Sequence, residues 1–192
     1  MTILLILAPY GVFAALMLAT SAAVSLFVSA AVCLAVIAFD IRRGRSIKIL
    51  GVGSVVTFVA TGLYVTLIDA QLSGSAVRFV VDTGVLVVTL FSILIRYPFT
   101  LQYAREVVDA ETAKLPGFVR ANYVITWAWA AAMVLMMIGN AAAIYVPWLP
   151  FWGSLLVAFT ARNCAIYFTK RYPQYLRAKY GTPPAGALPR SP

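Results

Sequence analysis

Charged side chains inside long apolar stretches are the residues of this chain that are best suited to chemistry. Arg162 lies within such a stretch, with Asn163 beside it. A charge at the centre of a bilayer costs roughly 2.5–3.5 kcal/mol even on insertion scales, which favours positions where it has a partner or a ligand. A fixed guanidinium can bind two oxygens of a phosphate or carboxylate. We therefore predict an anion or lipid-headgroup site at Arg162 and Asn163, with snorkelling of Arg162 to the bilayer surface as the alternative.

A second candidate group combines three charged residues near one end of the apolar stretches. Arg78 and Asp82 are one helical turn apart, and Asp69 precedes them by a short polar turn. Grouped carboxylates can gate cations or protons, which makes this group a candidate ion site. The simpler interpretation is an interfacial salt bridge that fixes the connection between two helices. The sequence is compatible with either interpretation.

The longest polar segment runs from residue 98 to residue 120. Its apolar residues recur near one face, which predicts an amphipathic helix over about 98–115 that lies on the inner leaflet. Clustered carboxylates at such a surface can hold magnesium for lipid-phosphate chemistry. Two of the charges also have the spacing of an ordinary i,i+4 ion pair, so we expect no metal here. The candidate residues of this motif are Tyr103, Arg105, Glu106 and Asp109.

The composition argues against several kinds of site. The chain has no histidine, which is the commonest haem and zinc ligand and the usual proton relay. Both cysteines, Cys33 and Cys164, lie in apolar stretches, where a thiol acts as a small hydrophobic group. No serine or cysteine has a recognisable base near it. We expect no cofactor and no catalytic residue, and we keep a membrane-embedded enzyme acting on lipid only as an alternative.

The elements that position these residues are long apolar stretches. Of the 192 residues 62% are hydrophobic and 11% are charged, and the mean hydropathy is +0.92. A helix of about 20 residues crosses a hydrocarbon core of roughly 30 Å and satisfies its own backbone hydrogen bonds in lipid. A break at Pro9–Gly11 would leave five spans instead of six. The sequence predicts an all-α membrane protein with six transmembrane helices in three hairpins, at about 3–19, 22–39, 47–69, 77–96, 121–146 and 151–169.

The distribution of basic residues predicts the orientation of these helices. Residues 1–170 form one transmembrane domain, and residues 171–192 form a tail that is first basic and then Pro-rich. Lys and Arg follow each predicted hairpin, whereas only Arg78 lies on the opposite side, so both termini are expected in the cytoplasm. The net charge of +9 is then a topological signal and not a sign of nucleic-acid binding. Membrane lipid with anionic headgroups is the expected partner, with a homo-oligomer or a larger membrane complex as further candidates.

Two short motifs carry the remaining information. The segments 96–101 and 171–176 share Arg-Tyr-Pro and a final Leu, which indicates either a repeated hairpin unit or a general preference for these residues at membrane exits. The stretch 97–106 reads YPFTLQYARE and is followed by Arg-Ala-Asn at 120–122 and a tryptophan-bearing span. This pattern resembles a motif of uncharacterised bacterial six-helix inner-membrane proteins and, more distantly, septation protein A-like proteins. The resemblance implies a bacterial inner-membrane location and no particular activity.

Small polar residues recur at four-residue spacing in the second and third spans. This pattern is typical of close helix packing, with a hydroxyl-lined path for a solute as the alternative. We predict a carrier or channel for a small solute or ion, with an accessory or organising subunit of a membrane complex as the main alternative. The residues of the pattern are Ser21, Ser25, Ser29 and Cys33 in one span and Gly53, Thr57 and Thr61 in the next.

Overall fold

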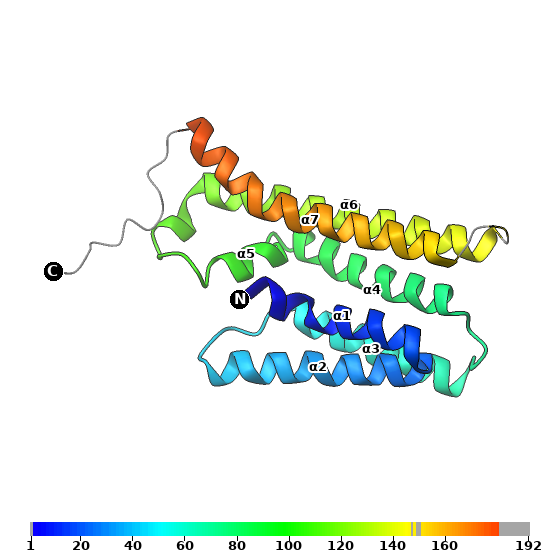
Figure 1. Cartoon of the computed structure of the whole chain (residues 1–192). Coiled ribbons are helices and arrows are strands. Elements are labelled where there is room, and N and C mark those ends of the chain that lie inside the picture. Colours follow the sequence, from blue (N-terminus) through cyan, green and yellow to red (C-terminus); the bar gives the residue numbers. More distant parts are fainter. Residues whose placement is uncertain (1, 147, 149–150, 181–192) are drawn as a thin grey trace.

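The computed structural model describes residues 2–146, 148 and 151–180. Within these ranges the chain is helical and contains no strand. The connection between the predicted fifth and sixth spans, apart from Trp148, and the Pro-rich tail after Tyr180 lie outside the described residues. In chain order the elements are α1 (Thr2–Ala19), α2 (Ala22–Arg42), α3 (Ile49–Leu67), α4 (Gly74–Leu94), α5 (Phe99–Ala104), the 3₁₀ turn η1 (Thr112–Lys114), α6 (Pro116–Tyr145) and α7 (Phe151–Tyr180) (Figure 1).

Local sequence signals set where several helices begin and end. Ser21 and Ser73 are N-caps of α2 and α4, because each hydroxyl accepts a hydrogen bond from the backbone N–H three residues later. Pro116 starts α6 at a position where a helix needs no N–H donor. Gly44 follows α2 with φ of 69°, a conformation that glycine adopts without steric cost.

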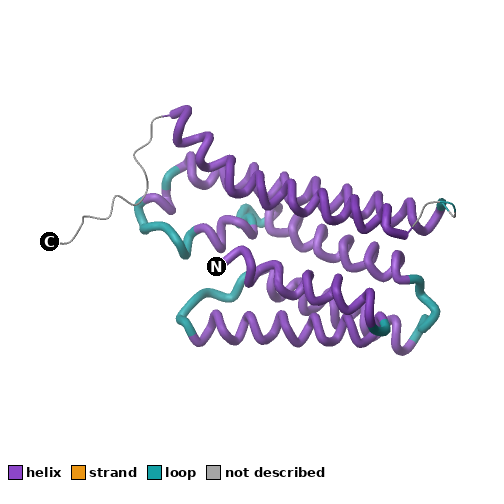
Figure 2. Tube along the Cα trace, in the orientation of Figure 1, coloured by secondary structure: helices purple, strands orange, loops and turns teal. Residues whose placement is uncertain are grey.

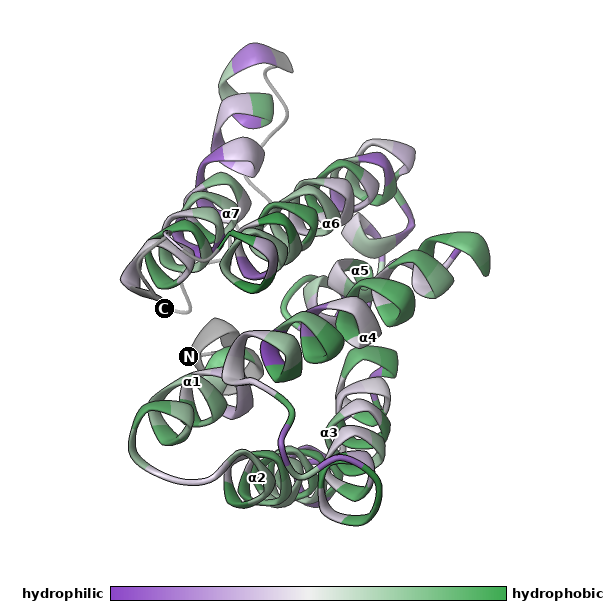
Figure 3. Cartoon of the chain, turned by 90° about the vertical axis from the view of Figure 1, so that its right-hand side faces the viewer, coloured by the Kyte–Doolittle hydropathy of each residue, from purple (hydrophilic) through white to green (hydrophobic). Residues whose placement is uncertain are grey.

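The six long helices lie side by side, and the chain reverses at each end (Figures 1 and 2). The start of α1, the α2–α3 connection, α5 and the end of α7 lie at one end, which we call the basic end. Viewed along the helices, the order α1, α2, α3, α4, α6, α7 follows an arc (Figure 3). The most extensive contacts join helices that are neighbours in this order.

Four helices, α2, α3, α4 and α6, are long and apolar enough to cross a membrane by length and composition. The apolar part of α1, Leu7–Ala19, is shorter. Large apolar side chains point outward along these helices, for example Leu67 and Leu94, which are 75% and 78% exposed. Such a surface is costly in water and favourable in lipid. Apolar helices of this length are compatible with a membrane protein, which agrees with the composition.

The predicted amphipathic helix over 98–115 is wrong in its extent. Helix α5 ends at Ala104, and the next helical turn begins only at Thr112. Asp109 competes with a continuous helix because its carboxylate accepts hydrogen bonds from the Thr112 backbone N–H at 2.8 Å and hydroxyl at 2.7 Å. Helix α5 is also not a surface element, since Phe99 and Leu101 are buried against the end of the bundle.

The two similar segments 96–101 and 171–176 adopt different backbone conformations. Arg96 has φ of 58° and α4 has already ended, whereas Pro173 lies inside α7. Ser92 explains the difference, because its hydroxyl accepts a hydrogen bond from the Phe99 N–H at 3.1 Å and so stabilises the chain reversal. The corresponding position before the second segment is Tyr167, which offers no such short acceptor. As a result, the predicted tail from residue 171 begins as the last third of α7.

Small residues bring α3 and α4 into close contact. A Cβ atom at Gly53 would lie 2.4 Å from a Val88 methyl carbon, and one at Gly84 would lie 2.5 Å from the Thr57 methyl carbon. The hydroxyls of Thr57 and Thr61 donate to carbonyls four residues earlier in their own helix. In α2, Ser25 and Ser29 do the same. These residues serve helix packing, as transmembrane helices commonly use small residues.

Candidate functional site

Two groups of polar side chains lie among the apolar helices. The first, here called the mid-helix group, consists of Asp82 on α4, Asn140 on α6 and Arg162 on α7. Asn140 Nδ2 donates a hydrogen bond to Asp82 Oδ2 at 2.8 Å. The half-buried Arg162 lies close enough for its positive charge to act on the Asp82 carboxylate. The group therefore combines an acceptor, a donor and a cation from three helices.

The mid-helix group lies well inside the length of the bundle. Asp82 is eight residues from the start of α4, which is about 12 Å at a rise of 1.5 Å per residue. Arg162 is eleven residues from the start of α7, or about 16 Å. Both depths approach the middle of a hydrocarbon core of roughly 30 Å. In such a core each charge needs a compensating neighbour, and the contact with Asn140 provides part of this compensation.

The other predicted residues of these two sites lie apart from the mid-helix group. Asn163 is exposed on α7, and its amide donates to the Phe159 carbonyl at 2.7 Å in the same helix. Asp69 accepts a hydrogen bond from the Gln71 backbone N–H at 3.0 Å, and none of the ion pairs between described residues includes it. Arg78 contacts Ser75 at 3.1 Å and acts electrostatically on Asp82. The predicted three-residue cluster is thus reduced to the pair on α4.

The second group, here called the end cluster, consists of Asp40, Arg45, Lys48 and Glu106 at the basic end. Lys48 Nζ lies 2.9 Å from Asp40 Oδ2 and 2.9 Å from Glu106 Oε1. Arg45 lies 3.3 Å from Asp40 and 3.9 Å from Glu106. The Lys48 side chain is only 4% exposed. Two cations and two anions balance, so the buried charges satisfy one another.

The YPFTLQYARE segment contributes Glu106 to the end cluster, where it takes part in two of the four ion pairs. The segment also links neighbouring helices at the basic end. Gln102 is buried in α5, accepts a hydrogen bond from the Ile49 N–H at 2.9 Å and donates to the Tyr97 carbonyl at 3.1 Å. Thr100 bonds to Thr126 of α6 at 2.7 Å. The segment therefore connects the start of α3 to α6 and closes the basic end of the bundle.

The predicted motif residues of this segment have separate roles. Tyr103 packs beside the Lys48 ammonium, which lies 5.3 Å from the ring centre, and burial raises the pKa of its hydroxyl. Glu106 belongs to the end cluster. Arg105 is exposed and stacks over the Tyr97 ring at 5.2 Å. Asp109 stays on the surface, where the hydrogen bonds from Thr112 lower the pKa of its carboxyl.

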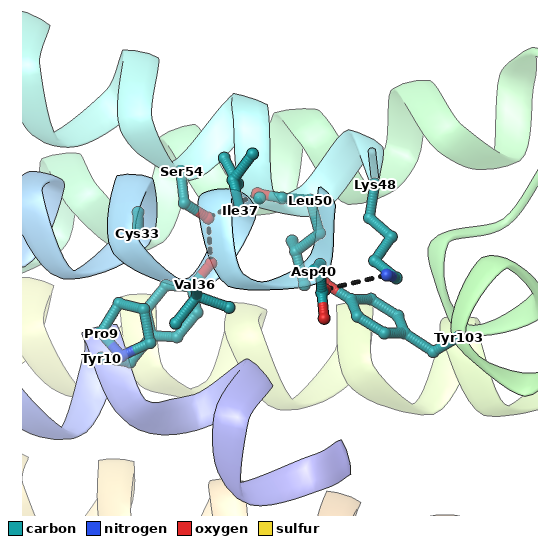
Figure 4. A pocket seen from close by; sticks show the side chains of 11 residues that line it. Pro9, Tyr10, Cys33, Val36, Ile37, Asp40, Lys48, Leu50, Ser54 and Tyr103 are labelled. Atoms are coloured by element: carbon teal, nitrogen blue, oxygen red, sulfur yellow. Dashed lines mark hydrogen bonds and ion pairs between the residues drawn. The ribbon is translucent and has the colours of Figure 1, made fainter. Parts of the chain in front are cut away.

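A small cavity lies between the end cluster and the interior of the bundle. Its volume is about 30 Å³, and its walls come from α1, α2, α3 and α5. Figure 4 shows Asp40 and Lys48 at one side, while the Tyr10 and Ser54 hydroxyls point toward each other and form a hydrogen bond. Cys33 also lines the cavity and is buried. The site thus brings charged groups and hydroxyls to one small, partly open cavity.

An apolar groove of about 570 Å³ follows the outer side of α6 and α7. Its floor is formed mainly by small residues, and the exposed thiol of Cys164 lies within it. A groove with this lining suits an acyl chain or another transmembrane helix. Among the described residues, no three His, Cys, Asp or Glu side chains are close enough to hold a metal ion.

Sequence reasoning missed Asp40, Lys48, Tyr10, Ser54 and Asn140. Asp40 is the only carboxylate in the first 68 residues and closes a long apolar span, which is a usable signal. Asn140 is the only amide within the apolar part of its span between 128 and 145. Their partners are 5 to 58 residues away along the chain, so spacing alone gives no pairing.

Three comparisons with known proteins found no relative of this chain. The chain matches no family model, no curated protein and no solved structure.

Proposed function

We propose that the chain is a carrier or channel for a small ion or solute in the inner membrane of a bacterium. In this proposal six helices, α1 to α4, α6 and α7, cross the bilayer as three hairpins with both termini in the cytoplasm. The lengths of α1 and α7, 18 and 30 residues, support two crossings beyond the four apolar helices. The basic residues gathered near α5 support a cytoplasmic location of that end.

The observation that carries the proposal is the Asp82–Asn140 hydrogen bond beside Arg162. A protein that only had to pack in lipid would gain stability from apolar residues at these positions, because buried charges are costly even when they are paired. Asp82 and Arg162 lie on different helices, and none of the four ion pairs between described residues joins them, so both groups can take a ligand when the helices move. A carboxylate and a guanidinium at mid-depth provide a binding place for either a cation or an anion.

Transport assays on reconstituted vesicles test this proposal directly. The purified chain is inserted into liposomes, and the flux of protons, Na⁺, K⁺, Cl⁻ and phosphate is measured with and without Asp82→Asn or Arg162→Ala. We expect each substitution to lower the flux of one of these ions at least tenfold. Circular dichroism and thermal unfolding in detergent show whether each variant is still folded.

Asn163→Ala is the matched control for Arg162→Ala. It changes the adjacent residue on the same helix, but its side chain is exposed and bonded only to its own helix. Flux through this variant should equal that of the unchanged protein. The proposal is wrong if no ion crosses the vesicles, or if folded Asp82→Asn and Arg162→Ala variants retain full flux.

A second function, as a non-enzymatic subunit of a membrane complex, is favoured by the groove between α6 and α7. The groove presents small side chains, including Ala131 and Cys164, to the lipid side, where another helix can approach closely. Ala131→Trp would fill this groove, whose lining includes no member of the mid-helix group. If Ala131→Trp releases a protein that co-purifies with the unchanged chain while ion flux is absent, the subunit function replaces transport.

A further inference from the structure

The cavity beside the end cluster has the size and lining of a water site. A water molecule needs about 10–15 Å³ of cavity volume measured with a water-sized sphere, and two to four polar partners. The cavity offers about 30 Å³ by this measure. Its lining includes the Asp40 carboxylate, the Lys48 ammonium and the Tyr10 and Ser54 hydroxyls. The cavity can therefore hold one or two water molecules and nothing much larger.

We infer that the carried species is a proton, and that it enters from the basic end through water in the cavity between Asp40, Lys48, Tyr10 and Ser54. This inference rests on the transport function proposed above. Size supports it, because a hydrated metal ion or an organic solute does not fit into about 30 Å³. A proton needs only a water molecule and adjoining hydroxyl groups.

The polar groups follow one another along the depth of the bundle. Ser54 lies five residues into α3, about 8 Å from the basic end. Its partner Tyr10 lies eight residues into α1, about 12 Å from the same end, and Asp82 lies twelve residues before the end of α4, about 18 Å from that end. Along the depth of the bundle, the hydroxyl pair therefore lies between the charged groups at the basic end and Asp82. Tyr103 also lines the cavity, and its ring centre lies 5.3 Å from the Lys48 ammonium.

The transfer balances without any further reactant. A hydronium ion at the basic end gives up its proton, and the cavity water receives one proton as it passes another to the Tyr10–Ser54 pair. Each hydroxyl likewise gains a proton as it loses one. The Asp82 carboxylate accepts the last proton and becomes neutral, while the hydronium becomes water. Glu106 Oε2, a buried oxygen without a hydrogen bond in the described part of the chain, can receive the first water.

Hydrogen exchange at Cys33 tests whether water enters the cavity. In a Cys164→Ser background Cys33 is the only thiol, and it lines the cavity. The S–H stretching band in the infrared should disappear within minutes of transfer to D₂O. Gly51→Val adds methyl groups to the cavity wall, where a Cβ would be in ordinary contact with Ile37, and should slow this exchange at least tenfold. Gly11→Val is the matched control, because its Cβ would meet no atom within 4 Å.

Proton flux tests the path itself. In vesicles that contain a pH-sensitive dye, Tyr10→Phe and Ser54→Ala should each lower proton uptake at least tenfold. Tyr10→Phe retains the ring that packs against Phe58, so it should remain folded even if Gly51→Val does not. Gly11→Ala should leave the uptake unchanged.

The outcomes separate this inference from the transport function. Asp82-dependent flux of another ion, with no proton flux, would overturn the proton inference and leave transport intact. Flux of no ion would overturn both. Slow exchange of the Cys33 thiol in the parent protein, or full proton uptake by Tyr10→Phe and Ser54→Ala, would exclude the cavity as the entrance.

Discussion

Lys48 has an environment unlike that of an ordinary surface lysine. Its ammonium lies 2.9 Å from two carboxylates and its side chain is almost fully buried. The desolvation of three charged groups is offset only while all of them remain paired. The end cluster therefore behaves as a unit in which the loss of one member leaves an uncompensated charge.

Substitution of this lysine should destabilise the protein strongly. We expect Lys48→Met to lower the free energy of unfolding by about 3 kcal/mol, because Asp40 and Glu106 then repel each other in a buried site. Arg105→Met is the control, since this exposed residue stacks on Tyr97 and should cost about 0.5–1 kcal/mol. Reversible unfolding in mixed detergent micelles measures both values. Equal losses in the two variants would contradict the assigned role of the end cluster.

The sequence identified single residues of the candidate site better than it identified their partners. Asp82 and Arg162 stand out because a charge in an apolar stretch is visible without any structure. Asp82 was expected to belong to a charged group with Asp69 and Arg78, whereas its hydrogen-bond donor is Asn140, 58 residues later. Contacts between helices depend on which faces meet, and one sequence does not contain this information.

At the scale of the elements, the bounds of α1 to α4 follow closely from the sequence, whereas α6 begins five residues before and α7 ends eleven residues after the predicted bounds. The length of an apolar stretch reflects bilayer thickness, and its ends are marked by polar and capping residues. Both signals can be read from a short segment of the sequence. The segment after Pro98 is different. Its local hydrogen bonds at Asp109 and its burial against α6 depend on tertiary contacts, so periodicity alone predicted one long surface helix.

The contact between α3 and α4 gives a prediction at this scale. Gly84→Ala would place a Cβ 2.5 Å from the Thr57 methyl carbon and should destabilise the fold by about 1–3 kcal/mol. The double variant Gly84→Ala, Thr57→Ala removes the two atoms nearest to the new Cβ and should recover most of this loss. Gly11→Ala meets no atom within 4 Å and should be neutral or gain up to about 1 kcal/mol. Thermal unfolding of the three variants measures these differences in stability. A Gly84→Ala variant as stable as the unchanged protein would contradict the close packing of α3 and α4.

For the whole molecule, the testable property is its orientation in the membrane. Gln71, between α3 and α4, and Glu111, between α5 and η1, are both exposed and lie on opposite ends of the bundle. In a background with both native cysteines replaced, Gln71→Cys should react with a membrane-impermeant maleimide added to intact cells. Glu111→Cys should react only after the cells are opened. The reverse pattern would place the basic end outside.

The arc of helices has a consequence for how the chain is made. Each long helix makes its largest interfaces with the helices that precede and follow it in the sequence. A helix that leaves the ribosome therefore finds its partner already inserted, and it does not have to wait for a distant segment. The end cluster is an exception, because Asp40 and Lys48 are synthesised about 60 residues before Glu106. Until α5 folds back, Lys48 lacks one of its two carboxylates, so the last stage of biogenesis at this end is the closure of that cluster.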